Sequence, residues 1–132
     1  MNDRKQVMIV EDSPTQALLL QDLVECGGWQ PVAVRSAEQA MRQIETDPPD
    51  LIMLDLYLPG MRGDELCRQI RMKFNTRDIP ILVLTAEDSE GIELKILESG
   101  ADGFVAKSTE NPIRLEQTTI YAAEDETSVN VI

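Results

Sequence analysis

The sequence predicts an α/β fold: a doubly wound, five-stranded parallel sheet with helices on both faces. Three observations predict it. Short apolar runs alternate with segments of helical periodicity along most of the chain. These runs lack the polar alternation of a strand that has one face in water, which indicates strands buried on both faces. With 132 residues, the chain has the length of one domain around one core.

The predicted strands are five short apolar runs bounded by polar or turn-forming residues. They are Gln6–Val10, Pro31–Val34, Asp50–Leu54, Ile79–Leu84 and Gly103–Ala106. Right-handed crossovers between parallel strands place all the strand carboxyl ends at one edge of the sheet. Binding and reaction sites of open α/β sheets form at that edge, near the point where the strand order reverses.

Four helices are predicted between the strands, each with an apolar stripe and some with a clear start or stop signal. The signals are Ser13-Pro14 at the first start, Gly27-Gly28 at the first end, Ser36 with Gln39 as a capping box, Pro48-Pro49 as a stop, Gly63 as the third start and Ser99-Gly100 as the last stop. The predicted apolar positions are Ala17, Leu19, Leu20, Leu23 and Val24; Ala37, Ala40, Met41 and Ile44; Leu66, Cys67, Ile70 and Phe74; and Ile92, Leu94, Ile96 and Leu97.

The segment after the fifth strand has two interpretations that the sequence leaves open. Asn111-Pro112 favours the start of a fifth helix. The alternation of Ile113, Leu115, Gln117, Thr119 and Tyr121 instead favours a strand. Residues 124–132 are acidic and polar, as in a tail or a truncated linker, so the domain is expected to cover residues 1–123.

Charge and composition exclude several functional classes. The 24 acidic residues against 12 basic ones give a net charge of -12, which disfavours direct binding of nucleic acid. No apolar run has the roughly 18 residues of a membrane span, and the polar N-terminus lacks a signal peptide, so a cytoplasmic protein is expected.

Cys26 and Cys67 form no metal-binding pattern and are expected to be buried, reduced thiols. The chain has no histidine, which excludes a catalytic triad, a Cys-His pair and a phosphohistidine on this chain.

Polar residues follow four of the five predicted strands. They are Glu11-Asp12 after the first, Asp55 after the third, Thr85 after the fourth and Lys107 after the fifth. Each alone fits a helix cap, a turn or a solvated end, but together they converge on one edge of the sheet. Three clustered carboxylates must protonate, separate or hold a cation, because each ionised pair at roughly 4 Å costs about 4 kcal/mol at an effective dielectric near 20. Oxygen ligands with open positions favour Mg²⁺, and Mn²⁺ would also serve.

This arrangement can support phosphoryl transfer to a carboxylate. A divalent ion and Lys107 would neutralise the oxygens of a transferring phosphoryl group, and Thr85 would supply a hydroxyl to another oxygen. Asp55 could then attack phosphorus and form an aspartyl phosphate.

Four motifs carry a resemblance to a known family. They are "VMIVEDSPTQ", "DLIMLDLYLPGMRGDELC", "ILVLTA" and "GADGFVAKS", in order from Val7 to about Ser108. The sequence resembles the receiver domain of two-component response regulators, which implies the flavodoxin-like strand order 2-1-3-4-5. It also implies a switch that accepts a phosphoryl group from a sensor histidine kinase or a histidine phosphotransfer domain, then changes its affinity for an output domain or protein. Such a domain assists its own phosphorylation and dephosphorylation rather than acting as an enzyme, and can form a homodimer.

The resemblance implies a role for each matching residue. Asp55 corresponds to the phosphoacceptor, Asp12 to the direct metal ligand and Glu11 to the acid that acts through water. The matches to other roles are the backbone carbonyl of Tyr57 as a metal ligand, Thr85 as the switch hydroxyl, Lys107 as the phosphate partner, Phe104 as the switch aromatic, Tyr57 and Glu87 as residues that tune phosphate lifetime, and Pro59 and Gly63 in the loop after the acceptor.

The sequence departs from the family where Ser108, rather than proline, follows Lys107. Among alternatives, a haloacid-dehalogenase-type phosphatase needs Asp-x-Asp, but Tyr57 stands two residues after Asp55. A flavin-binding domain needs a phosphate-binding loop where this chain has Glu11-Asp12. The remaining alternative is a non-phosphorylated, receiver-like module that only binds proteins.

Overall fold

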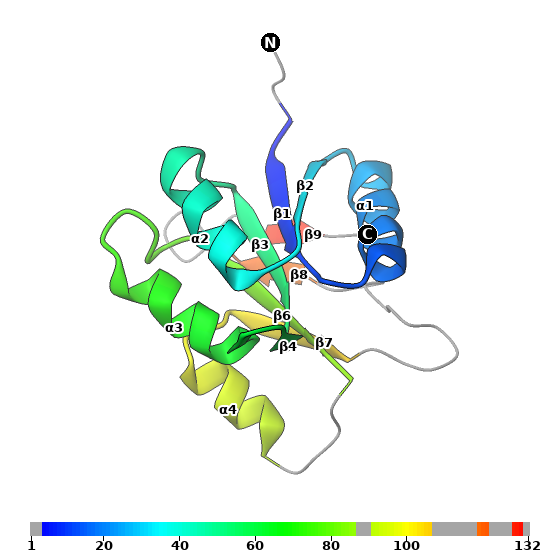
Figure 1. Ribbon diagram of the computed structural model, residues 1–132. Helices are drawn as coiled ribbons and strands as arrows, with labels where there is room; N and C mark the ends of the chain where they lie inside the picture. Colours follow the sequence, from blue (N-terminus) through cyan, green and yellow to red (C-terminus); the bar gives the residue numbers. More distant parts are fainter. Residues whose placement is uncertain (1–3, 87–90, 107–118, 122–127, 131–132) are drawn as a thin grey trace.

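The computed structural model describes residues 4–86, 91–106, 119–121 and 128–130 (Figure 1). Its centre is a five-stranded parallel sheet in the order β2-β1-β3-β6-β7. The strands are β1 (Gln6–Val10), β2 (Gln30–Val34), β3 (Leu51–Asp55), β6 (Ile81–Thr85) and β7 (Gly103–Ala106). The predicted fold class and strand order are confirmed.

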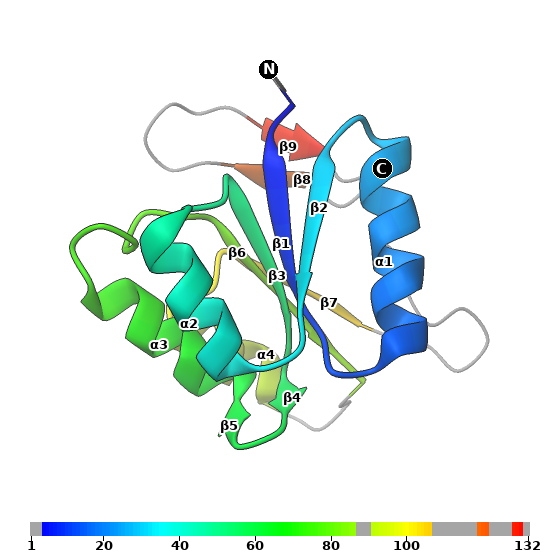
Figure 2. The same ribbon diagram turned by 45° about the horizontal axis from the view of Figure 1, so that its top comes forward.

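Helices cover both faces of this sheet, as predicted (Figure 2). The described helices are α1 (Pro14–Cys26), α2 (Ala37–Thr46), α3 (Gly63–Met72) and α4 (Ile92–Glu98). One face carries α1, while α2, α3 and α4 pack on the other. Within the described part of the chain, no helix is both long and apolar enough to cross a membrane.

Two short hairpins complete the described chain. β4 (Tyr57–Leu58) pairs with β5 (Met61–Arg62) directly after β3. β8 (Thr119–Tyr121) pairs with β9 (Ser128–Asn130), so the predicted strand alternative holds at residues 119–121. The predicted helix start at residues 111–112 lies outside the described residues, and the domain boundary at residue 123 stays a prediction.

The core is divided by the sheet because successive strand side chains point to opposite faces. On the α1 side lie Val7, Ile9, Leu51, Met53, Leu82 and Leu84. On the side of the other three helices lie Met8, Val10, Ile52, Leu54, Ile81 and Val83. All five residues of β3 and of β6 are buried. Burial on both faces is therefore the reason why these runs show no polar alternation.

The predicted helix signals are largely confirmed. The Ser13 hydroxyl accepts from the Gln16 N–H at 3.4 Å, and the Ser36 hydroxyl accepts from the Gln39 N–H at 3.1 Å. The Gln39 side chain accepts from the Arg35 N–H rather than that of Ser36, so only half of the predicted capping box forms.

The prediction that Phe74 points inward from the third helix is wrong. α3 ends at Met72, and Lys73 leaves it in an extended conformation, so the helical register does not reach Phe74. Phe74 is 77% exposed, and the Arg77 guanidinium lies over its ring at 4.6 Å. The buried Thr76 takes its place at the helix end, because its hydroxyl donates to the Ile70 carbonyl at 2.6 Å.

Some predicted apolar positions on the other helices are also exposed. Leu19 is 42% exposed on α1, and Leu94 and Leu97 are 61% and 45% exposed on α4. On α1 the buried residues are Ala17, Leu20 and Val24. Their spacing of three and four defines a stripe narrower than the sequence indicated.

The prediction that both cysteines are buried is wrong for Cys26. Cys26 is the last residue of α1, two positions past Val24 and turned from the buried stripe, and it is exposed. Cys67 is buried in α3 as predicted, and burial raises the pKa of its thiol above the ordinary 9.0. The folded chain therefore holds this proton to higher pH than the unfolded chain. The protonated thiol therefore contributes fully to the free energy of unfolding below the ordinary pKa of 9.0, and this contribution is lost as the pH rises through the raised pKa of the folded state.

We expect a maleimide at about pH 8 to modify Cys26 but not Cys67 in the folded protein, because only exposed thiolates react. Unfolding in urea should expose Cys67 to the reagent. Mass spectrometry of the Cys26→Ser variant is the control: modification of this variant without denaturant would contradict the burial of Cys67.

Candidate functional site

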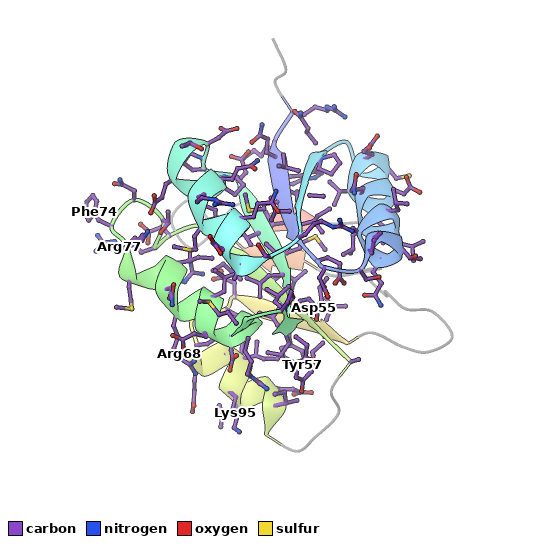
Figure 3. All side chains as sticks on the ribbon, in the orientation of Figure 1. Asp55, Tyr57, Arg68, Phe74, Arg77 and Lys95 are labelled. Carbon is purple, nitrogen blue, oxygen red and sulfur yellow. The ribbon has the colours of Figure 1, made fainter. Side chains whose placement is uncertain are left out.

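Three carboxylates meet at the carboxyl edge of the sheet. Glu11 and Asp12 directly follow β1, and Asp55 ends the neighbouring strand β3. One carboxylate oxygen from each of the three lies within 4.8 Å of the others. Figure 3 shows Asp55 at this end of the sheet. The predicted convergence of these acids is therefore present in the structure.

Backbone contacts fix Glu11. Its N–H donates to the Val34 carbonyl at 3.0 Å, which extends the pairing of β1 with β2 by one residue. Its Oε2 accepts from the Ser13 N–H at 3.3 Å, at the cap of α1. Glu11 is 2% exposed, while its neighbour Asp12 is exposed. The pair thus presents one fixed, buried acid and one that reaches solvent.

Asp55 is 8% exposed and is oriented by the chain that follows it. Its Oδ1 accepts from the Tyr57 N–H at 3.2 Å. The Leu56 N–H donates to the Leu84 carbonyl at 2.8 Å, so the backbone around Asp55 is held on the β6 side as well. The carboxylate is held at the strand tip by a local turn and a neighbouring strand.

Gly63 brings helix α3 against this strand tip. Its N–H donates to the Leu56 carbonyl at 2.6 Å. A Cβ at this position would overlap the Asp55 carbonyl oxygen and come within 2.7 Å of Leu54 Cδ1 and 2.9 Å of Leu56 Cα. Glycine is required here by the close approach of two backbones. This explains the glycine of the predicted loop.

A short hairpin, which the sequence did not predict, follows β3. Pro59 and Gly60 form its two-residue turn, and Gly60 has a φ of 80°, which glycine adopts without strain. The turn pairs Tyr57 with Arg62, whose guanidinium carbon lies 5.2 Å from the centre of the Tyr57 ring. Arg62 Nε also contacts Asp64 Oδ1 at 3.1 Å. The Pro-Gly pair was the signal that could have predicted this pairing.

The structure describes two of the other predicted site residues. Thr85 ends β6 and is 2% exposed, one residue past Leu84, which pairs with Asp55. Phe104 lies in β7 opposite Val83 and is partly buried against the core. Lys107 and Glu87 lie outside the described residues.

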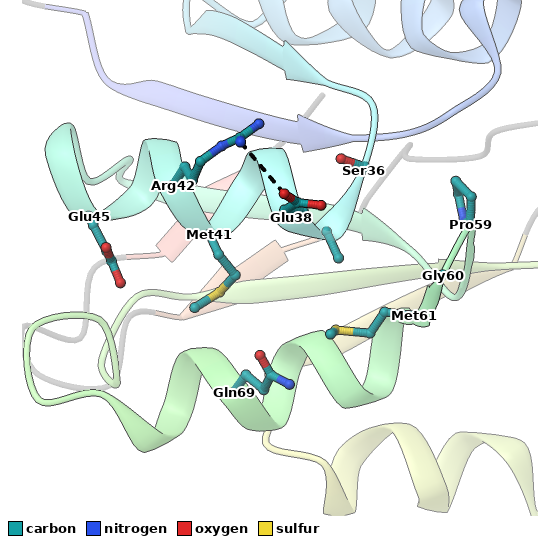
Figure 4. Close-up of a pocket in the computed structure, with 10 residues that line it drawn as sticks. Ser36, Glu38, Met41, Arg42, Glu45, Pro59, Gly60, Met61 and Gln69 are labelled. Carbon is teal, nitrogen blue, oxygen red and sulfur yellow. Dashed lines mark ion pairs between the residues drawn. The ribbon is translucent and has the colours of Figure 1, made fainter.

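A cavity of about 490 Å³ lies between α2, α3 and the β4–β5 turn (Figure 4). Its apolar lining includes Met41, Pro59 and Met61, and the Glu38–Arg42 ion pair lies at its rim. None of the three clustered carboxylates lines it. The acid cluster is therefore separate from this cavity and lies at the edge of the sheet.

The donor set of the cluster is chemically uniform. All three groups offer carboxylate oxygens, the ligands preferred by hard divalent cations such as Mg²⁺. Glu11 and Asp55 are both buried, and two ionised carboxylates within 4.8 Å of each other repel by at least about 3 kcal/mol at an effective dielectric near 20. A divalent cation would relieve this repulsion, so the residues present fit such an ion.

The response regulator receiver domain family matches residues 7–119, and the chain belongs to this family. Transcriptional regulatory protein BaeR of Escherichia coli O6:H1 is 41% identical over 102 residues, which are 77% of this chain and 41% of BaeR. Polar-differentiation response regulator DivK of Brucella ovis is 31% identical over 120 residues, which are 91% of this chain and 98% of DivK. The chain thus spans less than half the length of BaeR and nearly all of DivK.

Solved receiver structures share the fold. The signal receiver domain of a signal transduction histidine kinase from Syntrophus aciditrophicus has a TM-score of 0.73 and 39% identity, covering 78% of each chain. The Mn(2+)-bound form of response regulator Rcp1 has a TM-score of 0.73 and 26% identity, covering 80% of this chain and 82% of that one. The protein is a receiver domain homologous to phosphorylation-activated response regulators.

Proposed function

We propose that Asp55 is the phosphoacceptor of this receiver domain. The observation that carries the proposal is the position of Asp55, which ends β3 within 4.8 Å of two further carboxylates, in a chain matched to the family over residues 7–119. The donor would be a phosphohistidine on a sensor histidine kinase or a histidine phosphotransfer domain. We take residues 1–123 as the switch domain and residues 124–132 as a tail or linker, in a cytoplasmic protein.

We assign Glu11, Asp12, Asp55 and the backbone carbonyl of Tyr57 to a Mg²⁺ site that could also take Mn²⁺. The uniform oxygen donor set supports this assignment, as does the Mn²⁺ of the related Rcp1 structure. When bound, the ion supplies positive charge to the oxygens of the transferring group. The buried Glu11, fixed by the Ser13 N–H, orients the cluster, and the exposed Asp12 leaves it open to an incoming partner.

In the proposed transfer, a carboxylate oxygen of Asp55 attacks phosphorus and the phosphorus–nitrogen bond of the donor breaks. The histidine nitrogen keeps the electron pair, and the phosphoryl group remains on Asp55 as an acyl phosphate. The Tyr57 N–H holds the other carboxylate oxygen during the approach. We assign the Thr85 hydroxyl and the Lys107 ammonium to the phosphoryl oxygens.

The output is a two-state change at the carboxyl edge of β6 and β7. Thr85 would move toward the phosphoryl group, and Phe104 would turn further inward into the space that Thr85 leaves. New contacts of about 2–3 kcal/mol in one state would change the two populations substantially. Tyr57 and Glu87 are proposed to tune the lifetime of the phosphoryl group, and an output domain, a partner protein or a second copy would read the change. The domain thus assists its own phosphorylation and dephosphorylation and acts as a switch rather than as an enzyme.

The test is intact-mass analysis after incubation with Mg²⁺ and acetyl phosphate. We expect the wild type to gain the mass of one phosphoryl group and Asp55→Asn to gain none, because the amide is a poor nucleophile. Asp50→Asn is the matched control: Asp50 directly precedes β3, at the end opposite to Asp55, and its carboxylate accepts from the Gln6 N–H, so this variant should label like the wild type. Equal labelling of Asp55→Asn would contradict the proposal, and an unlabelled wild type would favour the binding-only module.

A further inference from the structure

The Tyr57 side chain begins beside the acceptor carboxylate. Its backbone N is 3.2 Å from Asp55 Oδ1, and Figure 3 shows both residues at the same end of the sheet. Tyr57 is 48% exposed, whereas Asp55 is 8% exposed. Because the ring is attached to the residue whose N–H binds this carboxylate, and because it is half exposed, it can cover the solvent side of Asp55 in one of its rotamers. The position of the ring therefore bears on how fast water reaches a group carried by Asp55.

An arginine outside the predicted site holds this ring. Arg62 pairs directly with Tyr57 across the β4–β5 hairpin. Its guanidinium carbon lies 5.2 Å from the ring centre, within the range of a cation–π interaction. Side chains of directly opposed residues in an antiparallel pair are close enough to limit each other's rotamers. Arg62 therefore restricts the positions that the Tyr57 ring can take.

Asp64 holds Arg62 in turn. Arg62 Nε contacts Asp64 Oδ1 at 3.1 Å, and the same oxygen accepts from the Glu65 N–H at 3.1 Å. Asp64 is 8% exposed and lies in the first turn of α3, next to Gly63. Gly63 allows α3 to pack directly against the backbone of Asp55. Asp64 therefore holds Arg62 in a fixed position relative to the Asp55 carboxylate.

We propose that Arg62 is a positioning residue that acts through Tyr57. Fixed by Asp64, it keeps the Tyr57 ring over the approach to Asp55 and slows hydrolysis of the acyl phosphate. In that hydrolysis a water oxygen attacks phosphorus and the bond from phosphorus to the Asp55 oxygen breaks. The products are the free carboxylate and inorganic phosphate, and the water proton passes to phosphate and solvent. This inference rests on the proposed phosphorylation of Asp55.

The contacts favour a steric role for Arg62 over a purely electrostatic one. Its charge is already paired with Asp64, which reduces its field at the acceptor. A guanidinium stacks on a ring as a plane, which an ammonium cannot do. Arg62→Lys therefore separates charge from stacking: it should give a phosphoryl lifetime between those of the wild type and Arg62→Ala.

The test is a double-mutant cycle on the lifetime of the phosphoryl group. Wild type, Arg62→Ala, Tyr57→Ala and the double variant are loaded with acetyl phosphate and Mg²⁺, freed of donor and followed by intact mass. We expect Arg62→Ala to lose the phosphoryl group roughly threefold faster. Losing an exposed cation–π contact should lower by about that factor the population of molecules in which the ring covers Asp55. In the Tyr57→Ala background the same substitution should have no further effect.

Arg68→Ala is the matched control. Arg68 lies further along α3 and is ion-paired with Glu65 at 3.2 Å, and its side chain is 48% exposed against 47% for Arg62. Its lifetime should equal that of the wild type. Three results would overturn the inference: an unchanged lifetime for Arg62→Ala, an equal effect of Arg62→Ala without Tyr57, or loss of labelling in Arg62→Ala alone. An unlabelled wild type would instead overturn the proposed function itself.

Discussion

Gly63→Ala is expected to lower the free energy of unfolding by about 3 kcal/mol, at the upper end of the range for overpacked sites. The added Cβ would overlap the Asp55 carbonyl oxygen and come within 2.9 Å of Leu56 Cα. These are backbone atoms of Asp55, at the end of β3, and of the next residue, so they cannot rotate away as a side chain can. The substitution should also reduce labelling of Asp55, because helix α3 and the strand tip must move apart. Urea denaturation measures the first effect and intact mass the second.

Gly103→Ala is the control for this substitution. Gly103 lies in β7, and a Cβ there would meet only the flexible end of the Leu82 side chain, at 3.3 Å. We expect a loss below about 1 kcal/mol. If Gly63→Ala proved as stable and as readily labelled as Gly103→Ala, the close approach of α3 to the end of β3 would be contradicted.

Arg71→Ala is the second substitution with a large expected effect. Arg71 joins the end of α3 to the loops before β6 and β7 through four groups. They are the carbonyl oxygens of Arg77, Ile79 and Gly100, at 3.0, 2.6 and 2.9 Å, and the Asp102 carboxylate, at 2.8 Å. Asp102 also accepts from the Ile81 N–H at 2.8 Å. Losing the guanidinium leaves the carbonyl oxygens and the carboxylate without this donor. The free energy of unfolding should fall by about 3 kcal/mol, which urea denaturation measures.

Arg77→Ala separates this network from the general loss of an arginine. Arg77 lies in the same loop region, but its side chain is 54% exposed and meets Asp78 only at 4.0 Å. Figure 3 shows Arg77 beside Phe74, away from Asp55. An exposed ion pair and cation–π contact are worth below about 1 kcal/mol each, so a small loss is expected. Equal losses for the two variants would contradict the structural role of Arg71.

The sheet and the acid cluster were predictable because both follow from periodicity and topology. Runs such as β3 are apolar throughout since both of their faces are buried. The parallel arrangement then brings the ends of β1 and β3 together whatever the side chains are. Glu11, Asp12 and Asp55 could therefore be placed together before any distance was known.

The parts that the sequence did not predict depend on tertiary contacts or on exact helix ends. Phe74 was misplaced because α3 ends two residues before it, and the Thr76 hydroxyl then donates to the Ile70 carbonyl at the helix end. Cys26 was misplaced because the apolar stripe of α1 is narrow. The contact of Arg62 with Tyr57 requires the register of a two-residue turn, and periodicity carries no information about such a short element.

The most direct test of the account identifies the residue that carries the phosphoryl group. Borohydride reduces an acyl phosphate to an alcohol with release of phosphate, and thus converts a phosphorylated aspartate to homoserine. After labelling with acetyl phosphate and Mg²⁺, followed by reduction and proteolysis, tandem mass spectrometry should find homoserine at position 55 and aspartate at position 12. Homoserine at position 12, or phosphate on any other side chain with position 55 unchanged, would contradict the assignment of Asp55 as the phosphoacceptor.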